Sequence, residues 1–285
     1  MTATHTREVI FSHVARLLDA RADSKSLARF EAIFWLTTLG TLHLEDHFRT
    51  DLGMWVNVSL WSFLVCSLLT ILLIGIRGTD FHSPSRFRSA YWDFALPIGR
   101  FGAAASFTVY ASLKTYALGL RNDEAALALG LWLIAMMGPW ARRSTQFLIA
   151  AIFISAGLQK LIPLAAWWWN GEAIQAWLRW SNLLYVGQYA DWQRELNRWL
   201  LVHDLKVWLG PAVVMGEISL GIAALSRRTW PLAALGMAAM LIGFRSVLYV
   251  PFSLLAPLLI FAWSWPQRGS SRNDEDEMTV IQGTA

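Results

Sequence analysis

Long apolar runs separated by short polar or basic stretches make up most of this chain. A helix needs about 20 mainly apolar residues to cross roughly 30 Å of hydrocarbon, and a window of about 19 residues locates such segments. The pattern predicts eight spans and an all-α, polytopic membrane helical bundle. The predicted spans are residues 27–44, 54–76, 94–118, 124–141, 146–164, 207–225, 230–246 and 249–265.

The last two predicted spans share only the residues 230–265, and Pro251 and Pro257 lie in the second of them. Proline removes a backbone donor and kinks helices, and short hydrophobic segments match a bilayer poorly. We therefore expect both helices to be short, kinked or partly re-entrant. A seven-span alternative would move the C-terminus outside, but Arg268 and Arg272 favour the cytoplasm.

Composition and charge support a membrane protein and suggest its orientation. The chain is 55% hydrophobic and 15% charged, with a mean hydropathy of +0.40, which exceeds what one soluble core needs. Basic residues precede the first span and follow the second, fourth and sixth, so we expect both termini in the cytoplasm, in a bacterial inner membrane. The pI near 9.5 is then explained by basic residues in the loops that orient the protein in the membrane. We therefore expect no nucleic-acid partner. The basic residues are Arg7, Arg16, Arg21, Lys25 and Arg29, then Arg77, Arg86 and Arg88, then Arg142 and Arg143, and then Arg227 and Arg228.

Three regions follow from these patterns: a leader (1–26), a transmembrane domain (27–265) and a tail (266–285). The leader carries charges and no continuous apolar stretch, so we expect it to be cytoplasmic and no signal peptide. The tail is polar, which predicts disorder. The single cysteine, Cys66, lies in an apolar run and excludes an intramolecular disulfide or a cysteine metal site.

The segment 165–206 is rich in tryptophan and is predicted to be external. Trp167, Trp168 and Trp169 are consecutive and precede Gly171, and tryptophan favours the membrane–water interface. Helical spacing predicts two amphipathic helices in the interface. One interpretation is an aromatic anchor, and the other is a lid over a cavity open to the outer leaflet. The spaced residues are Ile174, Trp177, Leu178 and Asn182, followed by Leu196, Trp199 and Leu200.

Ionisable residues inside apolar segments are the candidate functional groups, because hydrocarbon makes a charge expensive. Lys160 lies near the end of the fifth span; it extends toward the headgroups or faces a cavity as a desolvated amine. Glu217 lies deep in the sixth span, with Arg245, Arg100 and Lys160 as candidate partners. Structural pairing is the favoured role for Glu217. Arg100 and Lys114 bracket only 13 residues of the third span, so at least one of them must lie within hydrocarbon or reach far to leave it.

The stretch FLIAAIFISAGLQKLIPLAAWWWNGEAIQAWL, with the helices that follow it, resembles a known membrane domain. An apolar helix ends in Ala-Gly-x-x-Lys-Leu, a Trp- and Gly-containing loop follows, and the next helix has a central acidic residue. This pattern is similar to the membrane domain of vitamin K-dependent gamma-carboxylases and their bacterial relatives, the horizontally transferred transmembrane domain family. The resemblance implies that Lys160 matches the base that deprotonates a quinol, and that a quinone or quinol is the cofactor.

The chain departs from that family at three places. Asn122 and Asp123 stand where the carboxylases have Asn-His, and Arg245 ends a stretch where many relatives have histidine. Only 20 residues follow residue 265 in this sequence, so we expect no soluble substrate domain here. We therefore expect no gamma-carboxylation by this chain.

Two functions remain open at this point. The first is a non-carboxylating membrane module that binds a lipophilic ligand, a peptide or a partner membrane protein. The alternative is a small membrane oxidoreductase or modifying enzyme that uses a quinol-like substrate, with Lys160 as base and Glu217 and Arg245 tuning its charge. The Trp loop, Gly171 and Arg100 are the candidate binding residues.

Other chemistry has little support in the sequence. A transporter with Glu217 at its midplane is weaker, because symmetric broken helices are not evident. His43 and His203 lack a spaced third ligand, so we expect no metal site. Phosphate-loop and nucleophile-elbow motifs do not occur.

Overall fold

The computed structural model describes residues 24–44, 53–79, 86–118, 122–137, 140–162, 167–184, 190–203, 205–248 and 254–263, and every regular element in these ranges is a helix. The predicted all-α class is confirmed for this part of the chain. Nearly all of the predicted leader and the whole predicted tail lie outside the described residues. The α-helices are α2 (Ser24–Leu44), α3 (Met54–Thr79), α4 (Arg86–Leu118), α5 (Asn122–Met137), α6 (Ala141–Gln159), α7 (Glu172–Leu184), α8 (Asp191–Val202), α9 (Lys206–Leu225), α10 (Trp230–Gly243) and α11 (Leu255–Ala262); the π-helix η4 (Phe244–Leu248) follows α10.

Three segments of the described chain are long and apolar enough to cross a membrane: Met54–Ile74, Val207–Leu225 and Trp230–Leu248. They support the assignment to membrane proteins. The other predicted spans also contain helices, but their crossing remains a prediction. The last of them contains α11, which has eight residues and is therefore about 12 Å long. This agrees with the expectation of a short final helix.

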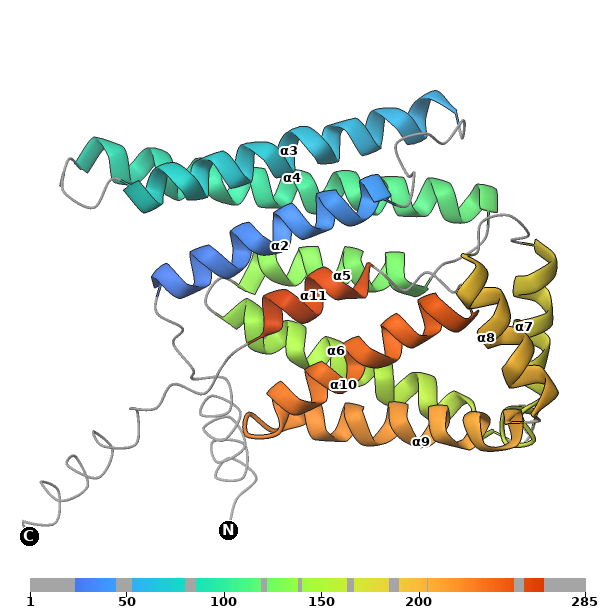
Figure 1. Cartoon of the computed structure of the whole chain (residues 1–285). Coiled ribbons are helices and arrows are strands. Elements are labelled where there is room, and N and C mark those ends of the chain that lie inside the picture. Colours follow the sequence, from blue (N-terminus) through green and yellow to red (C-terminus); the bar gives the residue numbers. More distant parts are fainter. Residues whose placement is uncertain are drawn as a thin grey trace, which may run out of the picture.

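The helices form a bundle with a separate pair across one end (Figure 1). Helix α3 lies along α4, and α6 lies along α9. The short α11 lies inside the bundle, in contact with α2, α5 and α6. Helices α7 and α8 cross the direction of the other helices at one end, where both contact η4. The bundle thus has a long body and an end cap made of α7 and α8.

Aromatic side chains fill the centre of the body. Phe34 of α2 makes an edge-on contact with Phe261 of α11, with ring centroids 5.5 Å apart. Phe63 of α3 lies 5.1 Å from Phe107 of α4, and all four side chains are buried. Rings in such offset or edge-on arrangements add about 0.5–1.5 kcal/mol per pair beyond their buried area. The aromatic core therefore joins helices from both ends of the described chain.

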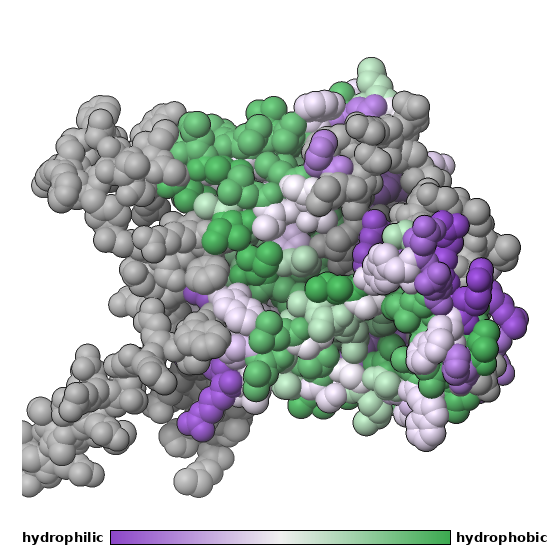
Figure 2. Space-filling view, in the orientation of Figure 1, coloured by the Kyte–Doolittle hydropathy of each residue, from purple (hydrophilic) through white to green (hydrophobic). Residues whose placement is uncertain are grey.

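On the face shown in Figure 2, the described part of the body is mainly apolar, whereas the end cap is more polar. On α3, the side chains of Trp61, Val65 and Leu72 are each more than half exposed. Side chains of this kind are stable on a surface that faces lipid. Hydrophilic residues gather instead where α7 and α8 lie. This distribution is consistent with a bilayer around the body.

The C-terminal end of α9 is closed by side chains from α6. The Arg143 Nη2 donates to Leu225 O over 2.7 Å, and the Gln146 amide donates to Ala224 O. Arg143 also donates to the Gln146 side-chain oxygen. Burial, with a smaller contribution from the charge of Arg227, lowers the pKa of Arg143 to about 10, so the group stays charged at neutral pH. A cation bonded to the final carbonyls stabilises this helix end.

We expect Arg143→Met to lower the free energy of unfolding by about 1–3 kcal/mol, because buried carbonyls of α9 lose a charged donor. Thermal unfolding in a mild detergent measures the change. The control is Arg228→Met, which removes an exposed arginine from the turn after α9 and should stay within about 0.5 kcal/mol of wild type. Equal melting temperatures for the two variants would contradict the capping role.

Candidate functional site

Helices α6 and α9 approach each other closely because each places a glycine at their contact. A Cβ atom on Gly157 of α6 would lie 3.1 Å from a carbonyl oxygen of α9. A Cβ on Gly221 of α9 would lie 3.0 Å from a carbonyl oxygen of α6. Small residues permit this kind of backbone approach between membrane helices. Lys160 and Glu217 lie one helical turn from these glycines, so the same packing brings them together.

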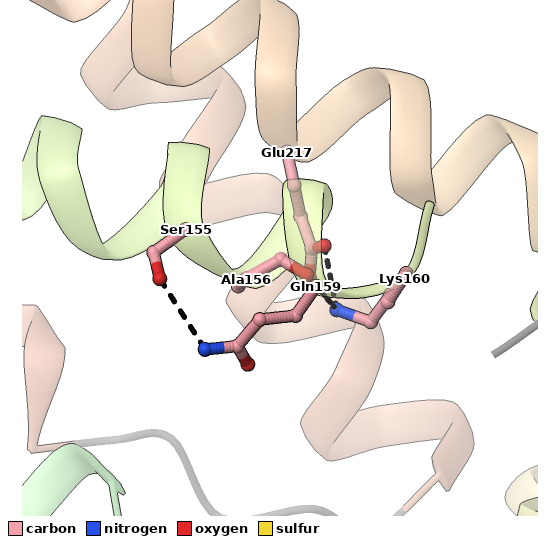
Figure 3. Close-up of polar contacts among 5 residues, drawn as sticks. All are labelled: Ser155, Ala156, Gln159, Lys160 and Glu217. Carbon is pink, nitrogen blue, oxygen red and sulfur yellow. Dashed lines mark hydrogen bonds and ion pairs between the residues drawn. The ribbon is translucent and has the colours of Figure 1, made fainter. Parts of the chain in front are cut away.

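Lys160 and Glu217 form an ion pair between the end of α6 and the middle of α9 (Figure 3). The Lys160 Nζ lies 2.7 Å from Glu217 Oε1 and 2.6 Å from Glu217 Oε2. The two side chains are 15% and 6% exposed, so little solvent screens the pair. Lys160 follows the last residue of α6, where the negative end of the helix dipole also favours a cation.

The Lys160 amine has two further contacts. Its Nζ lies 3.3 Å from Ala156 O, one turn back on α6, and 4.8 Å from the centroid of the Trp168 ring. An ammonium group has three donors and no acceptor. Two of these donors suffice for the Glu217 carboxylate and Ala156 O, and the ring adds a cation–π contact. The amine is therefore in contact with the Glu217 carboxylate, the backbone of α6 and the Trp168 ring.

The turn after α6 holds Trp168 over Lys160. Gly171 has a φ of 75°, which side chains other than glycine rarely adopt, and its N–H donates to Trp168 O over 3.3 Å. A Cβ on Gly210 of α9 would lie 1.9 Å from that same oxygen. The turn thus rests directly on α9, and glycine is needed on both sides of the contact. Trp167 and Trp169 are 45% and 39% exposed.

The structure separates the other two candidate partners of Glu217 from the lysine pair. Arg100 of α4 binds Glu31 of α2, with 2.6 Å between Arg100 Nε and Glu31 Oε1 and a second contact through Nη2. Arg245 lies on η4, where it lines a cavity between α10 and α11. Among the three candidates, Lys160 is the one that the geometry places on Glu217.

Two carboxylates that complete ion pairs were missed by the sequence analysis. Glu31 is 2% exposed and accepts from both Arg100 and the Trp35 indole, which lies 3.3 Å from Glu31 Oε1. Glu124 of α5 pairs with Lys114 of α4. Neither Glu31 nor Glu124 was considered as an ion-pair partner. Its place inside the apolar stretch ARFEAIFWL was the sequence feature that could have marked Glu31 as a buried ion-pair partner.

Comparison with protein-family models, with curated proteins and with solved structures gives no match for this chain. The resemblance to the gamma-carboxylase membrane domain therefore stays a prediction. Within the described residues, no group of three or more His, Cys, Asp and Glu side chains is arranged to hold a metal ion. The candidate site consists of the Lys160–Glu217 pair, Trp168 and the turn at Gly171.

Gly221→Ala should destabilise the protein by about 1–3 kcal/mol, because the added methyl group meets the α6 backbone and overpacks the contact. It should also separate Lys160 from Glu217. Gly40→Ala is the matched control, since nothing lies within 4 Å of a Cβ at that helical position. Thermal unfolding in detergent compares the two variants, and a Gly221→Ala protein as stable as Gly40→Ala would argue against close α6–α9 packing.

Proposed function

We propose that this chain is an eight-span membrane module that binds a lipophilic ligand and does not carry out carboxylation. The observation that most directly supports the absence of catalysis is the set of contacts made by the Lys160 amine. Its amine faces both oxygens of Glu217 and the carbonyl oxygen of Ala156. A lysine that acts as a base needs a lone pair free for the proton. In this structure the Lys160 amine is instead engaged by Glu217 and by the backbone of α6, as in a structural ion pair.

The ion pair then has a structural role. Removing one partner of a buried pair leaves an uncompensated charge and costs about 3–5 kcal/mol, whereas replacing both partners by apolar residues is often neutral. The pair joins the end of α6 to the middle of α9 and holds the tryptophan turn through Trp168. Lys160 and Glu217 accordingly fix helix register in this proposal.

The membrane placement combines the apolar body with the end cap. The three candidate spans and the exposed side chains of α3 favour a bilayer around the body. Trp180 on α7 and Trp192 on α8 are 61% and 56% exposed, as is usual for an aromatic anchor in the interface. Helices α7 and α8 therefore lie on the external surface of a bacterial inner membrane, and both termini are cytoplasmic.

The cavity between α10 and α11 is the reason for proposing a lipophilic ligand. Its volume is about 330 Å³, and its lining is mainly aliphatic. Small-molecule sites begin at about this size and are mostly apolar. A cavity between two helices of the body suits a narrow chain better than a folded partner protein or a peptide. We therefore place ligand binding there rather than at Lys160.

A quinol-using oxidoreductase remains the second candidate function. It is favoured by the burial of Lys160 beside an aromatic ring and by the resemblance of its motif to the carboxylase lysine. In that case Glu217 would take the proton from Lys160 before each cycle, and the amine would then accept one from the quinol hydroxyl.

Lys160→Met separates the two functions. If the pair is structural, the single variant should lose about 3–5 kcal/mol of stability, and the double variant Lys160→Met/Glu217→Leu should recover most of that loss. Wild type should show no quinol-dependent oxygen consumption. The measurements are thermal unfolding and oxygen electrode traces with a soluble quinol. Oxygen consumption by wild type, abolished in an equally stable Lys160→Met protein, would establish the oxidoreductase instead.

Ligand binding is tested by mass spectrometry of small molecules that co-purify in mild detergent. Wild type and the double variant should both retain a lipophilic molecule enriched over its share of the bulk membrane lipid. A wild-type protein that retains no enriched molecule would reject the ligand-binding part of the proposal.

A further inference from the structure

One wall of the cavity between α10 and α11 changes from apolar to polar residues along its length. Ala238, Ile242, Arg245 and Ser246 line it from α10 into η4, at the spacing of one helix face. The opposite wall, from α11, is apolar and includes Ala256 and Leu259. Seven residues separate Ala238 from Arg245, which is about 10 Å along a helix. The cavity is thus a mainly apolar slot with Arg245 at one end of its lining.

The small side chains of Ala238 and Ala256 leave this slot open. The same stretch of α10 faces outward, since Leu235 and Ile242 are 55% and 65% exposed. A hydrocarbon chain from the surrounding lipid therefore reaches the slot sideways, without entering from water. Free phosphate fits the guanidinium but not the aliphatic lining.

The polar end of the slot is held in place by the end cap. Gln193 of α8 donates from its Nε2 to Ser246 O over 3.1 Å. Ser246 and Arg245 both belong to the π-helical turn η4, a type of turn that is frequent at functional sites. Because α8 is polar and lies across the end of the body, Arg245 lies at the level expected for lipid headgroups.

We propose that this slot binds one anionic phospholipid from the leaflet that borders η4, with an acyl chain between α10 and α11 and the phosphate at Arg245. The inference rests on the proposed function and names its ligand. Arginine suits a phosphate because its planar donors bind two oxygens at once. Basic groups between membrane helices are a recognised basis for binding acidic headgroups.

The test is native mass spectrometry of purified protein with equal amounts of dioleoyl phosphatidylglycerol and dioleoyl phosphatidylcholine. Wild type should retain the anionic lipid preferentially. Arg245→Gln should reduce that preference about fivefold, the effect of one charge near a headgroup, and Arg245→Lys should keep most of it. The control Arg228→Gln removes an arginine outside the slot and should leave the ratio unchanged. An unchanged ratio in folded Arg245→Gln, or an equal fall in Arg228→Gln, overturns the proposal.

A second variant tests the acyl chain independently of the charge. Ala238→Met fills the slot and should reduce retention of both lipids, while thermal unfolding checks that the variant is folded. Undiminished retention in folded Ala238→Met overturns the proposal even if Arg245→Gln does not fold. The two proposals can fail separately. If the protein retains a lipophilic molecule without preferring an anionic headgroup, only the phospholipid proposal is rejected. If it oxidises a quinol and still prefers the anionic lipid, only the non-catalytic function is rejected.

Discussion

A charged side chain inside an apolar bundle must find an opposite charge, and the packing of this protein follows from that constraint. Each of three buried ion pairs in the described residues joins two different helices, so these pairs help to fix how the helices are aligned. Since an unpaired charge in such surroundings costs several kcal/mol, alternative helix registers that separate the partners are disfavoured. In the part of the chain that the structure describes, these three pairs are Glu31–Arg100 between α2 and α4, Lys114–Glu124 between α4 and α5, and Lys160–Glu217 between α6 and α9.

The pair between α6 and α9 also links the body to the end cap. Glycine contacts bring the two backbones together, and the ammonium of Lys160 then bonds to Glu217 and lies under Trp168. The same turn rests on α9 and continues into α7. A change at the ion pair is therefore expected to shift the end cap. This holds although both charged residues of the pair lie outside α7 and α8.

Much of the helical pattern was predictable from the sequence, because long apolar runs leave the backbone little alternative to a helix in lipid. Lys160 was among the candidate partners of Glu217, but sequence alone could not choose it over Arg100, since that choice depends on which helices are neighbours. Glu31 was overlooked for the same reason. The slot beside Arg245 has no sequence signature, because it is formed by residues of two helices that come together only after folding.

The short helix α11 has a consequence for how the protein is made. It comes last among the described helices, yet its Phe261 lies in the aromatic core beside Phe34 of α2, and Trp230 of α10 donates to Ala262 O over 2.9 Å. During synthesis the earlier helices are therefore made before the α11 side chains that pack between them. The bundle is completed only when α11 leaves the ribosome, so a chain interrupted before that point would expose its unfilled interior to proteolytic quality control.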